Sequence, residues 1–397
     1  MSLDFQQVRQ QVNALGKTAP ERERILLDMR ARILNVLDDN QGSLDILQQY
    51  VDVARENNPK LRCALPTTET LKTRTPSPPY PNVGVLVAAD GSQINPDREA
   101  PTDYFLINTG SIKYRLNTDT PPKTRTKTEL FYEKTDVYTE SGLVSNGLVA
   151  LRRDLAERTM LMEEALDEKL PEDRMFALVD GPVEIWVAGD RDLANAPEVK
   201  RAFDDYLGIL IKMYENRACF AGYVDKPRAD LVVRLLELAY LYKEQKIDKM
   251  GLMHPFSGMS DAQIFGQFLE PGERSAVFGV QSRNLDQYQT ETAIHFFYLN
   301  VGPHIARVEF PAWVAEDAQM LNDLHAILIQ QCRILGSRPY PYMLHRAHEI
   351  AVVKYEEKHQ LNTMIATELR NRGLTPDLGT NKQYAKDISG TRGRFGG

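Results

Sequence analysis

The stretch that decides the fold is Val83-Gly84-Val85-Leu86-Val87-Ala88-Ala89-Asp90-Gly91-Ser92, an apolar run that ends in an acid and a glycine. A second run of the same kind, Met175-Phe176-Ala177-Leu178-Val179, ends in Asp180-Gly181-Pro182. Near-continuous apolar runs of this length are typical of central strands that are buried on both faces. Each strand therefore delivers a carboxylate to its end, and the following glycine lets the backbone turn and approach a ligand closely.

Two strand-end acids suit a divalent-metal site for phosphoryl transfer, because two carboxylates can hold Mg²⁺ or Mn²⁺ while a substrate phosphate completes the coordination shell. A single Asp-Gly step is more often an ordinary turn. Asp90 and Asp180 together favour the metal site, since both follow buried runs. The order of strand, paired strands, long helix and second acidic strand predicts an α/β fold. This is an RNase H-like mixed sheet flanked by helices, in which two strand acids and one helix acid converge on metal.

The third acid should lie on the long helix predicted over roughly residues 145–170. Such a helix shows one stripe to the sheet, so most of its acids must be solvated surface charges. We favour Glu157, with Glu163 or Glu164 as the alternative. The full set of candidates is Asp154, Glu157, Glu163, Glu164 and Glu168.

The bulk composition narrows the class of protein. The chain has 397 residues and a formal net charge of −7, which argues against a protein that coats nucleic acid over its whole surface but allows a local basic channel. No segment is long and apolar enough to span a membrane, and residues 1–9 do not resemble a secretory signal, so we expect a cytoplasmic protein. Three widely spaced cysteines support neither a zinc knuckle nor a disulfide framework.

The chain divides into four predicted parts: a helical arm over residues 1–65, a Pro/Thr-rich linker over 66–82, a catalytic domain over 83–372 and a flexible basic tail over 373–397. Within the arm, Ala19-Pro20-Glu21-Arg22 should open a helix. Residues 117–128 read as a basic loop containing Lys123, Arg125 and Lys127. Two helices are predicted over 199–219 and 230–247, strands over 293–299 and 305–310, and one last helix from Tyr342 to Asn371.

Several short pieces of the sequence occur together in a fixed order. They are Ala89-Asp90-Gly91-Ser92-Gln93, Arg153 followed by Glu157, Leu178-Val179-Asp180-Gly181, Gly222-Tyr223-Val224-Asp225-Lys226, Arg307-Val308-Glu309-Phe310-Pro311, and Arg338-Pro339-Tyr340-Pro341-Tyr342-Met343-Leu344 ending at Ala347-His348. With these pieces in view, the chain resembles the NurA nuclease family over roughly residues 80–355. In one departure, Asp225 precedes Lys226 and Pro227 follows it, where the family often has a small polar residue before the lysine.

The resemblance implies an RNase H-like, Mn²⁺-dependent DNA nuclease, with Mg²⁺ as the alternative ion. It implies a 5'-3' exonuclease, with single-strand endonuclease cleavage left open. It also implies a toroidal homodimer that works with the HerA hexameric DNA-translocating ATPase in double-strand-end resection and break repair. By matching position, Asp90, Glu157, Asp180 and His348 would be metal ligands, and Tyr340 would lie beside the site.

His348 also has a case of its own. The predicted last helix has a buried stripe of Leu344, Ala347, Ala351 and Tyr355, so an imidazole at 348 should face or border the core. A lone histidine on such a face is more often a hydrogen-bonded structural residue than a ligand. Where three acids converge, however, a nitrogen donor favours Mn²⁺ over Mg²⁺.

Several residues are candidates for holding DNA. Arg153, Lys226, Arg228 and the 123–127 loop could contact the phosphate backbone, which would make binding independent of sequence. For most of them a solvated surface charge is the simpler interpretation. Tyr340 and Tyr342 alternate with prolines in a rigid extended segment, where their rings could stack on an unpaired base or pack at a dimer surface.

Two other classes compete with a nuclease. A non-catalytic adaptor could keep the fold as a docking platform for a DNA translocase, although the retained Asp90, Asp180 and His348 argue against it. An actin-like or sugar-kinase-like phosphotransferase also starts strands with Asp-Gly. It would need a second Gly-rich phosphate loop later in the chain, and the sequence offers none that is convincing.

Overall fold

The computed structural model describes residues 3–140, 142–167, 169–170, 173–185, 197–283 and 288–375. The chain forms two compact units, each built from two separate segments. Unit 1 contains residues 1–80 and 222–340, and unit 2 contains residues 81–221 and 341–397. No helix in these described ranges is long and apolar enough to cross a membrane. The candidate Glu168 and most of the predicted tail lie outside the described residues.

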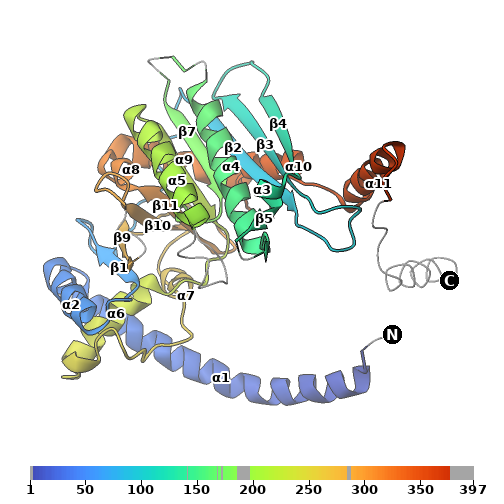
Figure 1. Cartoon of the computed structure of the whole chain (residues 1–397). Helices are drawn as coiled ribbons and strands as arrows, with labels where there is room; N and C mark the ends of the chain where they lie inside the picture. The colour runs from blue at the N-terminus through green and yellow to red at the C-terminus, as the bar shows by residue number, and fades with distance from the viewer. Residues whose placement is uncertain are drawn as a thin grey trace. The chain divides into compact units, whose positions relative to one another are not determined.

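Unit 2 is built on β2 (Val85–Ile94), which contains the longer of the two apolar runs that lead to an aspartate. β2 pairs antiparallel with β3 (Phe105–Arg115) and parallel with β7 (Met175–Asp180), and β3 pairs antiparallel with β4 (Lys123–Phe131). Every residue of β2 from Val85 to Ala89 is buried, as the apolar run predicts. These strands confirm the predicted mixed sheet (Figure 1). The predicted end of the first strand at Asp90 is wrong, because β2 continues to Ile94, whereas Asp180 is the last residue of β7.

The predicted basic loop at residues 117–128 is wrong in its second half, which belongs to strand β4. Threonines 124, 126 and 128 alternate with Lys123, Arg125 and Lys127, and this period of two suits a strand whose two faces differ. The register pairs Lys123 with Lys113 and Phe131 with Phe105. The basic residues of this segment therefore stand in a row on one face of a strand.

Helices cover both faces of the unit 2 sheet. α4 (Asn146–Leu166) begins at Ser145, whose hydroxyl oxygen accepts the Leu148 N–H, and it packs on β2 and β3. α10 (Tyr342–Ala351) packs on the opposite face of the same strands, and α5 (Pro197–Glu215) packs on α4. The short segments α3 (Lys134–Val137), β5 (Tyr138–Thr139) and β6 (Gly142–Leu143) complete the connection from β4 to α4.

The predicted last helix is wrong in its continuity, because it breaks after Ala351 and resumes as α11 (Tyr355–Asn371). The cause is tertiary. The Ser92 hydroxyl donates to the Ala351 carbonyl at 2.5 Å and accepts the Val353 N–H at 3.0 Å, which replaces the helical pairing there. Tyr355, predicted in the buried stripe, is 75 % exposed as a consequence.

Unit 1 is an antiparallel sheet packed on helices. Its strands are β1 (Cys63–Pro66), β9 (Phe278–Gln281), β10 (Ile294–Asn300), β11 (Ile305–Pro311) and the end of β8 (Cys219–Val224), which pairs with β11. Its helices are α1 (Phe5–Asn40), α2 (Leu44–Asn57), α6 (Leu231–Lys243), the 3-10 turn η2 (Ile247–Lys249), α7 (Asp261–Phe265), α8 (Ala312–Glu316) and α9 (Ala318–Ile334). The predicted helices near 199 and 230 and the strands near 293 and 305 are confirmed as α5, α6, β10 and β11.

The predicted start of the arm helix is wrong, because α1 begins at Phe5 and continues through Pro20. Asp4 caps it, with one carboxylate oxygen accepting the N–H groups of Gln6 and Gln7. A proline inside a helix removes one backbone hydrogen bond, so α1 has a weak point in mid-course. Only the C-terminal part of α1 reaches the core, where Ile33 and Leu37 are fully buried.

Candidate active site

Asp90 and His348 form the central pair of the site. Asp90 lies on β2 opposite Gly110 of β3, and the Nδ1 atom of His348 on α10 lies 2.7 Å from the Asp90 Oδ2 atom. The other carboxylate oxygen accepts the Gly91 N–H at 2.8 Å. His348 is 63 % exposed and Asp90 only 16 %, so the prediction that His348 borders the core is wrong. The imidazole ring lies on the solvent side of Asp90.

Gly110 explains how α10 comes so close to Asp90. A Cβ atom on Gly110 would stand 2.7 Å from the Ile350 Cγ2 atom and 2.8 Å from the Ala351 backbone nitrogen, both on α10. Any side chain at this position would therefore push the helix away from the sheet. The bare backbone of Gly110 sets the distance that lets His348 reach Asp90.

Glu157 approaches the same part of β2 from the other face of the sheet. A Cβ on Gly91 would lie 2.7 Å from the Glu157 Oε1 atom, so this carboxylate sits directly on the β2 backbone beside Asp90. Glu157 is 5 % exposed, and its oxygens lie 3.1 Å from Arg153 Nε and 3.5 Å from Arg158 Nη1. Burial raises the pKa of Glu157 to about 8; the two arginines oppose this shift, and the nearby charge of Asp90 adds to it.

The other acids of α4 face elsewhere. Glu163 and Glu164 pair with Arg125 of β4 at 3.0 and 3.1 Å, and Asp154 pairs with Arg153 at 2.6 Å. Of the described candidates, Glu157 is therefore the one beside Gly91. Its predicted role as third ligand stays a prediction.

Asp180 occupies the matching position on the neighbouring strand. The parallel register pairs Ala89 with Val179, so Asp90 and Asp180 are the next residues along β2 and β7, at the end of β7 and in the middle of β2. Neighbouring residues in a parallel register point to the same face of the sheet. Asp180 is exposed, and Gly181 has a φ of +88°, a conformation that glycine adopts without strain as the chain turns away.

The donor set fits a divalent ion in its chemistry. Carboxylates and an imidazole suit Mn²⁺ and can also accept Mg²⁺, and a cation would relieve the repulsion that Asp90 exerts on buried Glu157. Among the described residues, however, no three His, Cys, Asp or Glu side chains already converge as a metal cage. Asp90 is turned toward His348 on the α10 face, whereas Glu157 is held by Arg153 and Arg158 on the α4 face.

Sequence reasoning gave no role to the residues that hold α10 in place. The Asn108 side-chain amide donates to the Ala351 carbonyl at 2.7 Å, and the Thr128 hydroxyl donates to the Asn108 side-chain oxygen at 2.6 Å. Ser92 binds the same carbonyl and Val353. The period of two along β2 was a usable signal, because it places Ser92 on the same face as Asp90.

The predicted DNA-contacting residues are divided between the units. Arg153 and Tyr342 belong to unit 2, where Arg153 is engaged with Asp154 and Glu157. Lys226, Arg228 and Tyr340 belong to unit 1. Lys226 and Arg228 are exposed, and the Tyr340 ring stands edge-on to Tyr223 with centroids 5.6 Å apart. Asp225, which departs from the family pattern, lies 2.5 Å from His304 Nε2.

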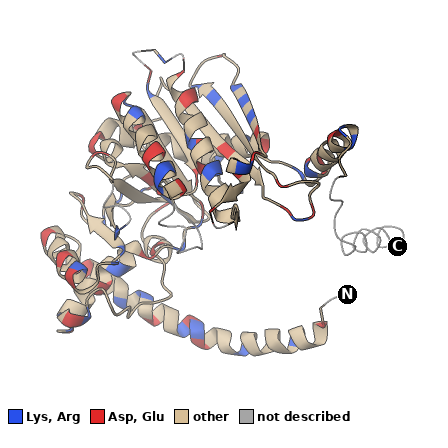
Figure 2. Cartoon of the chain, in the orientation of Figure 1, with Lys and Arg blue, Asp and Glu red and all other residues tan. Residues whose placement is uncertain are grey.

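The charges of β4 are partly neutralised. Figure 2 shows Lys and Arg in bands along this strand. Arg125 is shared between two glutamates of α4, and Lys127 lies 2.9 Å from Glu129. Their role in holding DNA stays a prediction.

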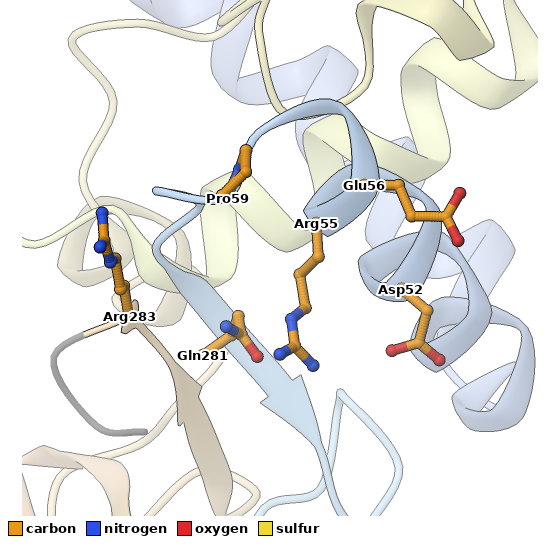
Figure 3. Close-up of a pocket in the computed structure, with 6 residues that line it drawn as sticks. All are labelled: Asp52, Arg55, Glu56, Pro59, Gln281 and Arg283. Atoms are coloured by element: carbon orange, nitrogen blue, oxygen red, sulfur yellow. The ribbon is translucent and has the colours of Figure 1, made fainter. Parts of the chain in front are cut away.

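Unit 1 contains a separate open cavity of about 620 Å³ at the end of α2 and β9 (Figure 3). Arg55 points into it beside Gln281, and Arg283 lies across from them. Two arginines are balanced by two acids, so the cavity has neither the acidic character of a metal site nor the positive charge of a phosphate channel. Its lining is Asp52, Arg55, Glu56, Pro59, Gln281 and Arg283.

Comparisons with known proteins agree with the resemblance seen in the sequence. Residues 84–353 match the model of the NurA domain family. The NurA nuclease from Sulfolobus solfataricus is similar at 13 % identity and a TM-score of 0.48, covering 92 % of this chain and 98 % of that one. A structure of NurA with manganese is similar at 12 % identity and a TM-score of 0.41, covering 90 % of this chain and 99 % of that one. No curated protein matches the chain.

Proposed function

Because this chain belongs to the NurA domain family over residues 84–353, we propose that it is a metal-dependent nuclease that hydrolyses phosphodiester bonds in DNA. The observation that carries the proposal is the group of side chains around Asp90 and Gly91 in the middle of β2. There Asp90 lies 2.7 Å from His348, Glu157 sits on Gly91, and Asp180 follows at the same level on β7. The proposed ion is Mn²⁺, because the donor set includes an imidazole and because a similar structure is that of NurA with manganese.

The proposed ligands are Asp90, Glu157, Asp180 and His348. A bound ion would activate a water molecule and stabilise charge on the phosphodiester. Arg153 and Arg158 hold the Glu157 carboxylate on the β2 backbone.

The proposed role is 5'-3' resection of DNA ends in double-strand break repair, by a homodimer fed by a HerA-type hexameric ATPase in the cytoplasm. An acidic chain of net charge −7 must gather its basic residues into a shared channel to hold DNA, and a dimer provides one. Tyr340 and Tyr342 are proposed to lie along that channel or at a docking surface. Lys226, Arg228 and Arg153 would contact backbone phosphates, which makes cleavage independent of sequence.

The decisive experiment is a nuclease assay on end-labelled single- and double-stranded DNA with Mn²⁺, with Mg²⁺ and with EDTA. We expect cleavage with Mn²⁺, weaker cleavage with Mg²⁺ and none with EDTA. Labels at the two ends separate 5'-3' digestion from internal cuts. Cleavage that survives EDTA, or no cleavage with any ion, would contradict the proposal.

One observation favours a second function, a non-catalytic adaptor for a DNA translocase. The Glu157 carboxyl already contacts Arg153 and Arg158, as a group with a purely structural role would. An adaptor would bind the ATPase and DNA with the same affinity in Mn²⁺ and in EDTA, and would leave labelled DNA intact in both. Metal-dependent cleavage of labelled DNA excludes this function.

A further inference from the structure

An apolar stripe runs along the exposed half of α1. Phe5, Val8, Val12 and Leu15 are 61, 36, 58 and 60 % exposed, and Ala19 continues their row. Single exposed apolar residues need no explanation, but a continuous stripe of large ones indicates a surface that something covers. The N-terminal half of α1 is therefore built to bind.

The spacing of this stripe suits packing against a second helix. Its residues alternate at intervals of three and four, which is the heptad pattern of a coiled-coil seam. The same repeat continues, after Arg22, into the part of α1 that enters the core of unit 1, as Leu26, Met29, Ile33 and Val36. The C-terminal half of this apolar row is thus packed in the core of unit 1. The N-terminal half has the same spacing but is exposed.

We propose that residues 5–19 of α1 pair with the same segment of a second copy of this chain, as a parallel two-stranded coiled coil. This rests on the homodimer of the proposed function and assigns a surface to it. A second copy supplies an identical stripe, so that the knobs of each helix meet the holes of the other.

The charges beside the stripe favour the parallel arrangement. In a parallel pair, Asp4 of one helix faces Arg9 of the other across the seam, twice by symmetry. Neither Asp4 nor Arg9 has an ion-pair partner among residues 3–140 or elsewhere in the described chain. The Asp4 oxygen Oδ2 is not used in capping, because Oδ1 accepts both N–H groups.

The body of unit 1 prepares the arm for pairing. A helix of about 15 residues is marginal by itself, but α1 is already nucleated where Ile33 and Leu37 lie in the core. Pro20 cannot donate to the Gly16 carbonyl, which gives the arm a bend point between the body and the stripe. Thr18 partly compensates, since its hydroxyl donates to the Leu15 carbonyl at 3.0 Å.

Disulfide cross-linking tests the pairing in the full chain. The natural cysteines, Cys63, Cys219 and Cys332, are all buried, so an introduced thiol on the arm would be the accessible one. We expect Val12→Cys to form a covalent dimer under mild oxidation and Gln10→Cys, on the far side of the helix, to stay monomeric. Equal cross-linking of both variants, or none with Val12→Cys, would overturn the parallel coiled coil.

Sedimentation measurements separate this proposal from the homodimer itself. Val12→Asp should weaken self-association at least about tenfold, a change of ~1.4 kcal/mol, whereas the matched Gln10→Asp should not. At concentrations where the chain is monomeric, the melting temperature of both variants should equal that of the unaltered chain, because both sites are exposed there. A dimer indifferent to Val12→Asp would overturn the arm interface and leave the homodimer standing. A chain that stays monomeric, with cleavage of DNA intact, would overturn both and leave the nuclease.

Discussion

At the scale of the residue, the site depends on two glycines as much as on its acids. Gly91 and Gly110 occupy neighbouring levels of β2 and β3 and open opposite faces of the sheet. The first lets Glu157 rest on the backbone, and the second lets His348 reach Asp90. Side chains from two helices thereby reach β2 at the adjacent residues Asp90 and Gly91.

Removing either strand acid should abolish cleavage. Asp90→Ala or Asp180→Ala takes a carboxylate from the proposed metal site, and we expect activity to fall by more than about 100-fold while the melting temperature without metal holds. The control is Asp225→Ala, which removes an exposed acid of unit 1. Near-normal nuclease activity in either strand variant would rule out the metal-site interpretation.

Glu157 should matter more than its neighbours on α4. Glu157→Gln should lose cleavage, whereas Glu163→Gln and Glu164→Gln should keep it, because the latter two face Arg125 rather than Gly91. The measurement is the rate of DNA cleavage with Mn²⁺. Loss at Glu164 with Glu157 indifferent would show that another helix acid holds the ion.

The raised pKa of Glu157 makes a prediction about stability. A carboxyl with a folded-state pKa of about 8 binds its proton more tightly in the folded state than in the unfolded state. Without metal, the free energy of unfolding should therefore fall as pH rises from about 4.5 to 8, by on the order of 5 kcal/mol at most.

Urea unfolding in EDTA at the two ends of this range would measure the effect. Glu157→Gln should make this fall in stability smaller, and Glu163→Gln should leave it unchanged. The same change in the free energy of unfolding with pH in the unaltered chain and in Glu157→Gln would contradict the raised pKa.

At the scale of the element, the position of α10 is the critical variable. It is set by hydrogen bonds from Ser92 and Asn108 to its last carbonyl and by the absence of a side chain at Gly110. The helix is short, so a shift of its C-terminal end also displaces its N-terminal turn and His348.

Gly110→Ala should separate His348 from Asp90. The new methyl would clash with Ile350 and the Ala351 nitrogen, so α10 must shift outward at a cost of about 1–3 kcal/mol. We expect cleavage to fall about 10- to 100-fold while the fold persists. Gly208→Ala in α5 is the matched control, because nothing lies within 4 Å of a Cβ there. Full activity of Gly110→Ala would show that the His348–Asp90 distance is unimportant.

At the scale of the whole molecule, each compact unit combines chain segments that are distant in sequence. Unit 2 carries the carboxylates of the proposed site, whereas residues 84–353, which match the family, are divided between both units. Unit 1 carries the arm, the exposed Lys226 and Arg228, and Tyr340. Substrate and partner contacts are thus proposed on both units, while the chemistry is proposed on one.

The partner prediction belongs to this scale. A nuclease whose substrate is threaded through a closed ring needs a translocase that moves the DNA. Duplex resection with a HerA-type ATPase should therefore be much faster with ATP than with a non-hydrolysable analogue. Co-purification of the two proteins and timed resection of labelled duplex DNA would measure this. Equal rates with and without the ATPase would leave a stand-alone nuclease.

The strands that carry the acids could be found from the sequence, because burial of β2 and β7 on both faces requires an apolar residue at nearly every position. The same holds for α4, whose cap and apolar spacing are local. These features place Asp90, Asp180 and Glu157 on their elements without reference to distant contacts.

Only tertiary structure decided how those elements meet. The break before α11 depends on Ser92, some 260 residues earlier in the chain, and β4 becomes a strand because β3 offers it an edge. α1 continues through Pro20, although local signals start a helix there. Each outcome rests on contacts between distant segments, which hydrophobic periodicity within a short window does not encode.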